Sequence, residues 1–242
     1  MRRDFYLATS LPVLPVLGKA PPMTPAELLE HLASRPAAAE AAAAIFLGDD
    51  LLQRQSLLAG QKLQAQPCVL SPGQLRDQEP LPEYLAAVPA DLPAGRLGAD
   101  AVWSAYYLYA EAVGRRCRNR FLALWVGFEV ALRNALAAAR AKALGLAVED
   151  HLLLPALGQT DWNLGATVAE WTSAATPLEG LRRLDEARWD WIAAHDQWFS
   201  FTDDELAAYA ARLLLLARWA RIASGSSQTV SDSRPAEAGA RG

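Results

Sequence analysis

The sequence predicts an all-α protein, an irregular bundle or cup of about six or seven helices. Hydrophobic residues make up 52% of the 242 residues and charged residues 21%, which is typical of a folded chain. No segment alternates apolar and polar residues over a useful length, and residues 4–11 are the one weak strand candidate. Helix-start motifs precede three of the apolar segments.

The first two helices are predicted at 24–34 and 37–59. Thr24 suits an N-cap, Pro25 the first helical position and Glu27 the third, which together form a capping box. Gly60 is a suitable C-terminal stop, and Gly48 is a possible break within the second helix.

A proline- and glycine-rich connection is predicted at 66–98, with one short helix around "PEYLAAV". From 99 to 144 no proline occurs, which predicts one long helix or two consecutive ones with Gly114 and Gly127 as weak points. Connections as long as 66–98 are often functional or mobile.

Three further helices are predicted at 162–175, 176–199 and 202–223. Thr176 with Glu179 and Thr202 with Glu205 have capping-box spacing. Residues 224–242 are small and polar, so we expect a disordered tail after one helical domain at 1–223.

Composition and motifs argue against several functional classes. A net charge of −4 gives no overall basic bias towards nucleic acid, and no uninterrupted apolar run reaches the roughly 18 residues of a membrane span. Cys68 and Cys117 form no C-x-x-C pair, and His31, His151 and His195 are far apart. We therefore expect no metal and no cofactor, and free thiols without a secretory signal favour the cytoplasm.

No catalytic constellation stands out, so we do not expect an enzyme. Asp49-Asp50 and Asp203-Asp204 are adjacent pairs, and neighbours in a helix do not face each other. The G-x-S-x-G motif, the phosphate-binding loop and the dinucleotide fingerprint do not occur.

Two compositional clusters have structural interpretations. The run "RRCRNR" at 115–120 favours a solvated or interface role, and Arg118 is a candidate interface residue. Four tryptophans crowd the C-terminal part and are expected to pack in the core: Trp189, Trp191, Trp198 and Trp219.

The central helix carries polar residues beside its apolar stripe. At 100° per residue, Glu129, Arg133 and Arg140 fall along one edge of the stripe, and Asn134 falls on the opposite side. Glu129 and Arg133 have the favourable i,i+4 order. The pair is either solvated or partly buried and orienting neighbouring helices. If it is partly buried, Arg133→Ala is predicted to cost about 1–3 kcal/mol.

Three patches carry a family resemblance: "RNRFLALWVGFEVALRNALAAARAKALG", "YLATSLPVLPVL" and "DDELAAYAARLLLLARWARI". They resemble a bacterial family of unknown function encoded within V-type ATPase operons. The pattern from Phe128 to Gly145 is also similar to the C/d family of central-stalk proteins in A/V-type ATPases. The resemblance maps that family's Glu-x-x-x-Arg-Asn element onto Glu129, Arg133 and Asn134, and its following basic positions onto Arg140 and Lys142.

The resemblance implies a helical cup like that of the C/d family, placed between the rotor ring and the central shaft. It implies a non-catalytic adapter of a V-type ATPase that transports protons or sodium ions. The protein would be cytoplasmic and peripheral at the inner membrane through the complex, with no nucleic acid and no small-molecule substrate. The alternatives are a scaffold or an assembly or regulatory factor for that complex, and an unrecognised helical enzyme.

Overall fold

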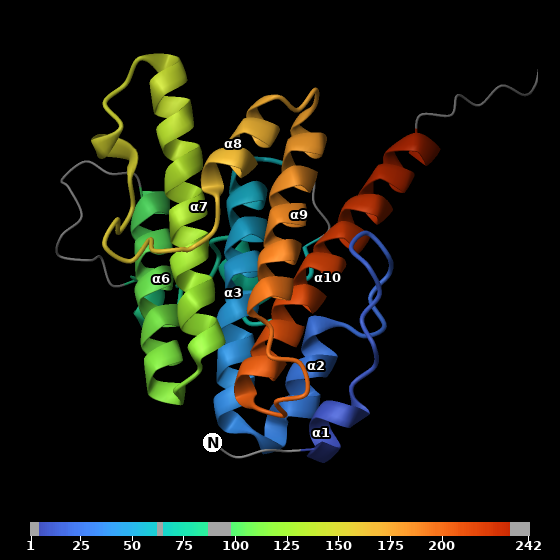
Figure 1. The fold of residues 1–242 in the computed structure, drawn as a ribbon. Coiled ribbons are helices and arrows are strands. Elements are labelled where there is room, and N and C mark those ends of the chain that lie inside the picture. Colours follow the sequence, from blue (N-terminus) through green and yellow to red (C-terminus); the bar gives the residue numbers. More distant parts are fainter. Residues whose placement is uncertain (1–4, 62–64, 87–97, 233–242) are drawn as a thin grey trace, which may run out of the picture.

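The computed structural model describes residues 5–61, 65–86 and 98–232, which form a bundle of ten α-helices without a strand (Figure 1). The helices are α1 (Phe5–Ser10), α2 (Pro25–His31), α3 (Pro36–Leu58), α4 (Pro72–Leu75), α5 (Glu83–Ala86), α6 (Gly98–Cys117), α7 (Arg120–Leu144), α8 (Leu164–Thr172), α9 (Pro177–His195) and α10 (Asp203–Asp232). The predicted all-α class is confirmed.

Differences from the predicted elements concern short helices and ends. Residues 5–10, the weak strand candidate, are the helix α1, and the connection at 66–98 contains α4 as well as the expected short helix α5. The described residues thus form ten α-helices, more than the six or seven predicted, and α1 and α4 are the two that were not expected. Helix α10 continues to Asp232, nine residues past the predicted end at 223, and 233–242 lie outside the described residues.

Local capping explains where several helices begin. Thr24 accepts a hydrogen bond from the Glu27 N–H, and the Glu27 carboxylate accepts one from the Thr24 N–H, so the predicted capping box is formed. Thr176 also accepts from the Glu179 N–H, but the Glu179 carboxylate accepts from the Ala175 N–H and not from that of Thr176, so only half of this box is formed. The predicted Thr202–Glu205 box is wrong, because the Glu205 carboxylate accepts from the N–H groups of the preceding loop instead.

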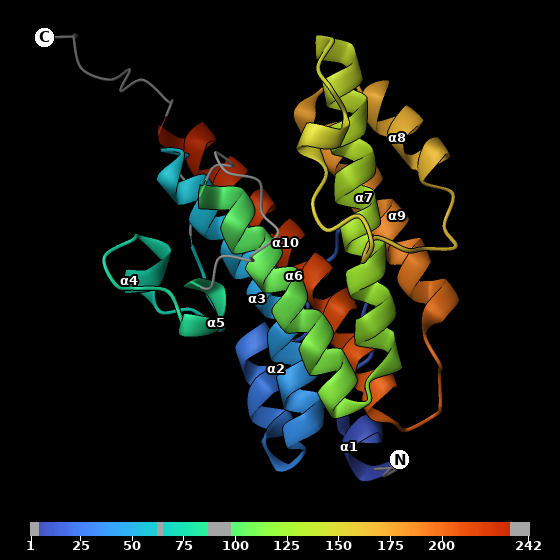
Figure 2. The same cartoon turned by 90° about the vertical axis from the view of Figure 1, so that its left-hand side faces the viewer.

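The core is built around α3 and α10, which lie side by side (Figures 1 and 2). Both helices are rich in buried alanine, whose small side chain lets helix backbones pack closely. The fully buried alanines are Ala38, Ala41 and Ala42 on α3 and Ala207, Ala208, Ala210 and Ala211 on α10. Helix α3 is unbroken at Gly48, so the suggested break there is wrong.

Helices α6 and α7 form an antiparallel pair whose turn lies at Arg118 and Asn119. Arg118 has a left-handed φ of 52°, and Asn119 caps α7 by accepting from the Leu122 N–H. The predicted weak points are packing positions instead. A Cβ on Gly114 would lie 3.2 Å from the Ala123 nitrogen, and one on Gly127 would lie 2.6 Å from the Gln159 carbonyl oxygen.

The two members of this pair approach closely near their turn and diverge towards the other end (Figure 2). The short helices α4 and α5 lie on the outer side of α3 and α6, away from α8 and α9 (Figure 2). Helices α8 and α9 form a second antiparallel pair that packs beside α7 and α10.

Helix α7 is the one described helix that is long and apolar enough to cross a membrane by length and composition. We expected no such segment, since charged residues flank the short run "FLALWVGF". Half of the most apolar stretch of α7 is buried within the bundle. Core helices of soluble proteins pass the same length and composition criterion, and α7 is a core helix here.

Candidate functional site

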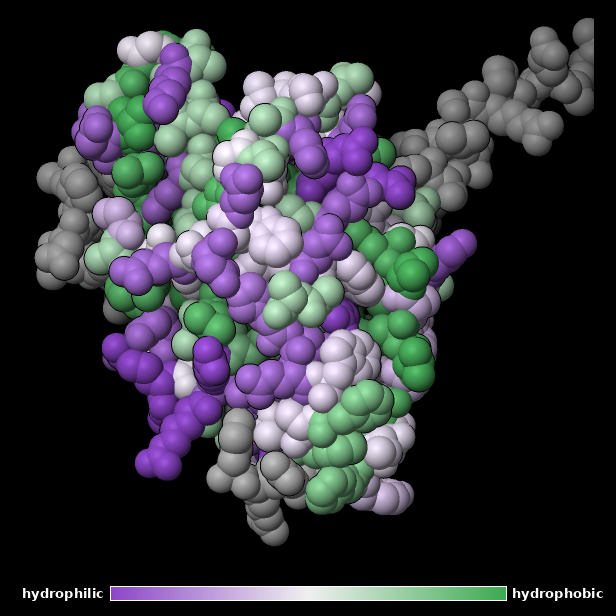
Figure 3. Space-filling view, viewed as in Figure 1, coloured by the Kyte–Doolittle hydropathy of each residue, from purple (hydrophilic) through white to green (hydrophobic). Residues whose placement is uncertain are grey.

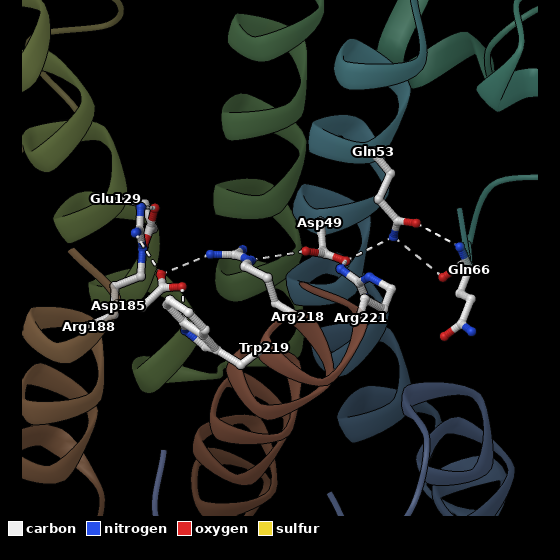
Figure 4. A network of polar contacts seen from close by, with 9 residues as sticks. All are labelled: Asp49, Gln53, Gln66, Glu129, Asp185, Arg188, Arg218, Trp219 and Arg221. Carbon is white, nitrogen blue, oxygen red and sulfur yellow. Dashed lines mark hydrogen bonds and ion pairs between the residues drawn. The ribbon is translucent and has the colours of Figure 1, made fainter. Parts of the chain in front are cut away.

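Two features stand out as candidate sites: an ion network with a cavity inside the bundle, and an apolar surface on its outside. The ion network connects α3, α7, α9 and α10 (Figure 4). Its charged members, the buried ion network from here on, are Asp49, Glu129, Asp185, Arg188, Arg218 and Arg221.

Asp185 is the centre of this network and is fully buried. One carboxylate oxygen accepts from Arg188 Nη1 at 3.0 Å and from Arg218 Nη1 at 2.9 Å. The other oxygen accepts from Trp219 Nε1 at 3.1 Å. A buried carboxylate needs such partners, because desolvation of an unpaired charge is strongly unfavourable.

Asp49 continues the network on α3. Its carboxylate accepts from Arg218 Nε at 3.2 Å, from Arg221 and from Gln53 Nε2 at 2.9 Å. The Gln53 oxygen in turn accepts from the backbone N–H of Gln66 at 2.7 Å. The network therefore fixes the segment after α3 as well as the helices themselves (Figure 4).

Glu129 on α7 is joined to α9 by a two-point contact. Arg188 donates from Nε at 2.6 Å and from Nη2 at 3.0 Å to the two carboxylate oxygens. The expectation that Arg133 is the partner of Glu129 is wrong, because Arg133 pairs with Asp100 at 2.9 Å. The two side chains diverge because the contact that buries Glu129 comes from another helix.

Burial and the neighbouring carboxylates have opposite effects on the pKa values of Arg188 and Arg218. Burial alone would lower the pKa of Arg188, but the attraction of Glu129 and Asp185 outweighs it and raises that pKa. For Arg218, burial again acts downwards, and Asp185 and Asp49 raise the pKa overall. Both guanidinium groups stay charged, so the network consists of fixed ion pairs.

The other predicted candidate residues lie apart from the network. Asn134 makes two hydrogen bonds of 2.8 Å to the backbone of Leu153 and so fastens the connection after α7. Arg140 lies over the Trp171 ring at 5.0 Å. Lys142 is exposed in the last turn of α7, where a positive charge suits the helix dipole, and Arg118 lies in the α6–α7 turn.

A cavity of about 320 Å³ lies where α7 diverges from α3 and α6, and we call it the central cavity. Aromatic residues of α6 form one wall, namely Trp103, Tyr106 and Tyr107. The opposite wall carries Glu129, Arg133 and Arg140 of α7. Asp49, Arg188 and Arg218 bring the ion network to its inner end, and His151 also lines it.

The apolar surface is formed by five exposed side chains: Phe5, Val13, Val16, Trp198 and Phe199. Trp198 is 60% exposed and Phe199 77%. Most of these residues border a groove of about 530 Å³ between residues 8–16 and the ends of α9 and α10. Apolar side chains gather at the lower right of the face in Figure 3, over α1 and the N-terminal segment.

The loop that presents these aromatics has an unusual backbone. Phe199 and Phe201 have φ values of 61° and 54°, a left-handed conformation that large side chains seldom adopt. The Glu205 carboxylate holds the loop by accepting from the Phe199 N–H at 3.1 Å and the Phe201 N–H at 2.7 Å. Backbone strain of this kind is concentrated at functional positions.

The ion pair between Arg212 and Asp196 lies beneath the Trp198 ring of the apolar surface. Arg212 donates to Asp196 at 2.8 Å, and its guanidinium lies 4.9 Å from the Trp198 ring centre. Burial raises the pKa of Asp196 to about 6, although Arg212 acts in the opposite direction. One face of the Trp198 ring therefore packs on the Arg212 guanidinium, and the other face is exposed to solvent. The expectation that Trp198 packs in the core is wrong.

Neither feature has a metal-binding arrangement. Within residues 5–61, 65–86 and 98–232, no group of three or more His, Cys, Asp and Glu side chains could hold a metal ion. Burial raises the pKa of the Cys68 thiol to about 12 and that of the Cys117 thiol to about 11, so neither is an activated nucleophile.

A family model described as "Protein of unknown function (DUF2764)" matches residues 78–229. The chain belongs to the DUF2764 family. The matched part of this DUF2764 protein includes Glu129, Asp185 and the loop with Trp198, whereas Asp49 on α3 precedes it. No curated protein and no solved structure matches the chain.

Sequence reasoning missed most members of the buried ion network. Asp185 and Arg188 have i,i+3 spacing in α9, and Arg218 and Arg221 follow the apolar run at 213–217 in α10. Charged residues within such a helix are the pattern that could have indicated a buried network. Pairing between α9, α10 and α3 depends on tertiary contacts, which the sequence does not display.

Proposed function

We propose that this DUF2764 protein is a non-catalytic helical adapter of a bacterial V-type ATPase that links the rotor ring to the central shaft. The observation that carries the proposal is the apolar surface with its aromatic loop. Contiguous exposed apolar surface bordered by polar residues marks interaction sites in soluble proteins. Trp198 has the side-chain type that contributes most often to binding energy at protein interfaces.

The rigidity of the bundle supports the same proposal. An adapter that transmits rotation has to resist deformation between its two partners, and the buried ion network fixes four helices relative to one another. The choice of a V-type ATPase rests on the three resembling patches, of which the longest is in α7. The complex would hold the protein at the cytoplasmic side of the inner membrane.

The occupant we propose for the apolar surface is an apolar helical segment of a central-shaft protein. The groove beside the aromatic loop has a volume of about 530 Å³, and residues 8–16 form one of its sides. Amphipathic helices commonly bind in such grooves through several apolar anchors.

The test is co-purification with the ATPase from cells in which the intact complex is recovered. We expect the tagged wild-type chain to bring down ring and shaft proteins. The double variant Trp198→Ala/Phe199→Ala should reduce the recovered shaft protein at least about tenfold, since two aromatic anchors each contribute about 1–2 kcal/mol or more. The matched control is Leu144→Ala at the end of α7, which is 73% exposed and far from the groove in sequence.

Two outcomes would contradict this proposal. Recovery of neither ring nor shaft with the wild-type chain removes the ATPase as partner, and equal loss in the control variant removes the apolar surface. The same purification separates the alternative of an assembly or regulatory factor. A rotor adapter stays in the active enzyme in fixed stoichiometry, whereas a factor is absent from it.

A further inference from the structure

The central cavity carries a second, independent inference. Its volume of about 320 Å³ is at the lower end of the range of ligand pockets. Trp103, Tyr106, Tyr107 and Trp125 supply aromatic surface, and four arginines lie among the remaining apolar and polar lining residues. The cavity is therefore sized for a small molecule and combines aromatic with cationic groups.

Two largely buried tyrosines in this cavity have hydroxyl groups without a protein partner in the described part of the chain. Tyr106 is 5% exposed and Tyr107 is 4% exposed, and neither hydroxyl has a hydrogen-bond partner among the residues that the structure describes. Burial raises the pKa of both phenols above the ordinary value, so both keep their proton. The two hydroxyl oxygens are not among the buried atoms that lack a partner, so they keep some exposure within the cavity, where a ligand can accept a hydrogen bond from each.

Gly48 makes room for one of these hydroxyls. A Cβ at this position would lie 2.6 Å from Tyr106 Oη, although Gly48 is in the middle of α3. Glycine within a helix is destabilising by about 1 kcal/mol relative to alanine. Glycine is therefore explained at position 48 by the Tyr106 hydroxyl, since the side chain of alanine, a better helix former, would displace that hydroxyl.

Hydrogen-bonding capacity in the cavity favours an acceptor-rich ligand. The carboxylates that line it are already engaged: Glu129 accepts two bonds from Arg188, and Asp49 accepts from Gln53, Arg218 and Arg221. Arg133 uses one nitrogen for Asp100 and keeps other N–H groups free. The free groups are thus mainly donors, namely guanidinium N–H and phenol O–H.

The charge balance points in the same direction. Asp49, Glu129 and Asp185 offset the three arginines of the buried ion network, and Asp100 offsets Arg133. Arg140 lies over Trp171 and has no carboxylate partner in the described part of the chain. One positive charge at the cavity therefore remains without a counter-charge.

We propose that the central cavity binds a small organic anion, whose carboxylate or phosphate group is held by Arg133 and Arg140 and whose further acceptor atoms reach the hydroxyls of Tyr106 and Tyr107. A ring or other flat apolar body of this ligand lies against the aromatic wall. This site goes beyond the adapter function and beyond the sequence-based expectation of no small-molecule substrate.

Calorimetric titration of the full chain with four probes tests the proposal. Benzoate and phenyl phosphate are the anionic probes, and benzyl alcohol and benzylamine are the neutral and cationic controls. We expect the anions to bind at least about tenfold more tightly than either control, since a charge-assisted hydrogen bond contributes about 1.5–3 kcal/mol. Tryptophan fluorescence should change in parallel, because Trp103 and Trp125 line the cavity.

Variants locate the site. Tyr107→Phe and Arg133→Gln should each weaken benzoate binding about tenfold. The matched control is Tyr109→Phe, which makes the same change two residues along α6, where the ring stacks on Tyr84 outside the cavity. A cooperative thermal unfolding transition in each variant establishes that it folds.

Three results would overturn the proposal. These are no saturable binding of either anion up to about 10 mM, equal affinity for benzyl alcohol, and equal benzoate affinity in Tyr107→Phe and Tyr109→Phe. Co-purification with the ATPase does not depend on any of them, so this site and the adapter function stand or fall separately.

Discussion

The buried ion network and the apolar surface reverse the usual placement of side chains. Six charged groups lie inside the bundle, and large apolar groups such as Trp198 and Phe199 lie outside it. Inside, every charge of the network has a partner of opposite sign on another helix or turn. Outside, the aromatic rings have protein on one face only. Paired charges indicate a fixed structure, whereas unpaired apolar faces indicate a surface that binds something else.

Removal of Asp185 should have the largest effect on stability. Asp185→Ala leaves Arg188 and Arg218 buried without their shared partner, which should lower the free energy of unfolding by about 3–5 kcal/mol. The neighbouring Glu186→Ala removes exposed ion pairs with Arg182 and Arg183 and should change it by less than about 1 kcal/mol. Urea denaturation measures both, and equal losses would mean that the network is no more than a solvated cluster.

Asp50 tests a buried carboxylate that is held without a cation. Burial raises its pKa to about 6, although the backbone N–H groups of Leu70, Val69 and Cys68 pull it down. Between about pH 4 and pH 6 the folded chain holds this proton while the unfolded chain has released it. Its stabilising contribution is complete below about pH 4 and is lost as the pH rises to about 6, by on the order of 3 kcal/mol.

Urea denaturation between about pH 4 and pH 7 checks this window. The fall in the free energy of unfolding with rising pH should be shallower in Asp50→Asn than in the wild-type chain. Asp196, whose pKa burial also raises to about 6, should supply much of the slope that remains. Identical slopes in the wild type and Asp50→Asn would refute this account of Asp50.

Glu129 and Arg133 sharpen the contrast between an inner and an outer ion pair on the same helix. Glu129→Gln removes the charge that Arg188 contacts at two points and should cost about 2 kcal/mol. Arg133→Gln affects a partly exposed pair with Asp100 and should cost less than about 1 kcal/mol. Thermal unfolding of both variants measures the two stability losses. A larger loss for Arg133→Gln than for Glu129→Gln would contradict this ranking and favour the Glu129–Arg133 pair predicted from sequence.

The smallest effect is expected on the outside. Phe199→Ala should change the free energy of unfolding by less than about 0.5 kcal/mol, because the ring is 77% exposed. Phe128→Ala removes a fully buried ring stacked on Trp191 and should cost about 3–5 kcal/mol. A loss above about 1 kcal/mol for Phe199 would show that the aromatic loop is part of the core and not a docking surface.

Local rules predicted the parts of the fold that depend on nearby residues. The capping box at Thr24, the cap at Thr176 and the end of α3 before Gly60 are all formed. Each depends on contacts within a few residues, which a sequence displays directly. The Thr202–Glu205 box is not formed, because the Glu205 carboxylate accepts hydrogen bonds from the N–H groups of Phe199 and Phe201 in the loop before α10.

For the candidate site, the sequence left open whether the Glu129 contact is solvated or partly buried. The helical projection placed Glu129 at the edge of the apolar stripe, and the structure has a partly buried, helix-orienting contact there. Its partner, Arg188, comes 59 residues later, and no periodicity within α7 could select it. Gly48 and Gly127 show the same limit, since each was a possible break in isolation and became a packing position through Tyr106 and Gln159.

By itself, the sequence determined the helical class, most helix ends and the absence of a strand-forming pattern, because these follow from local propensity and capping. Only the tertiary structure decided which charges neutralise each other, where α6 and α7 part to leave a cavity, and which aromatic residues remain outside. Those outcomes depend on the packing of helices that are distant in the chain, where volume, burial and charge must be satisfied together.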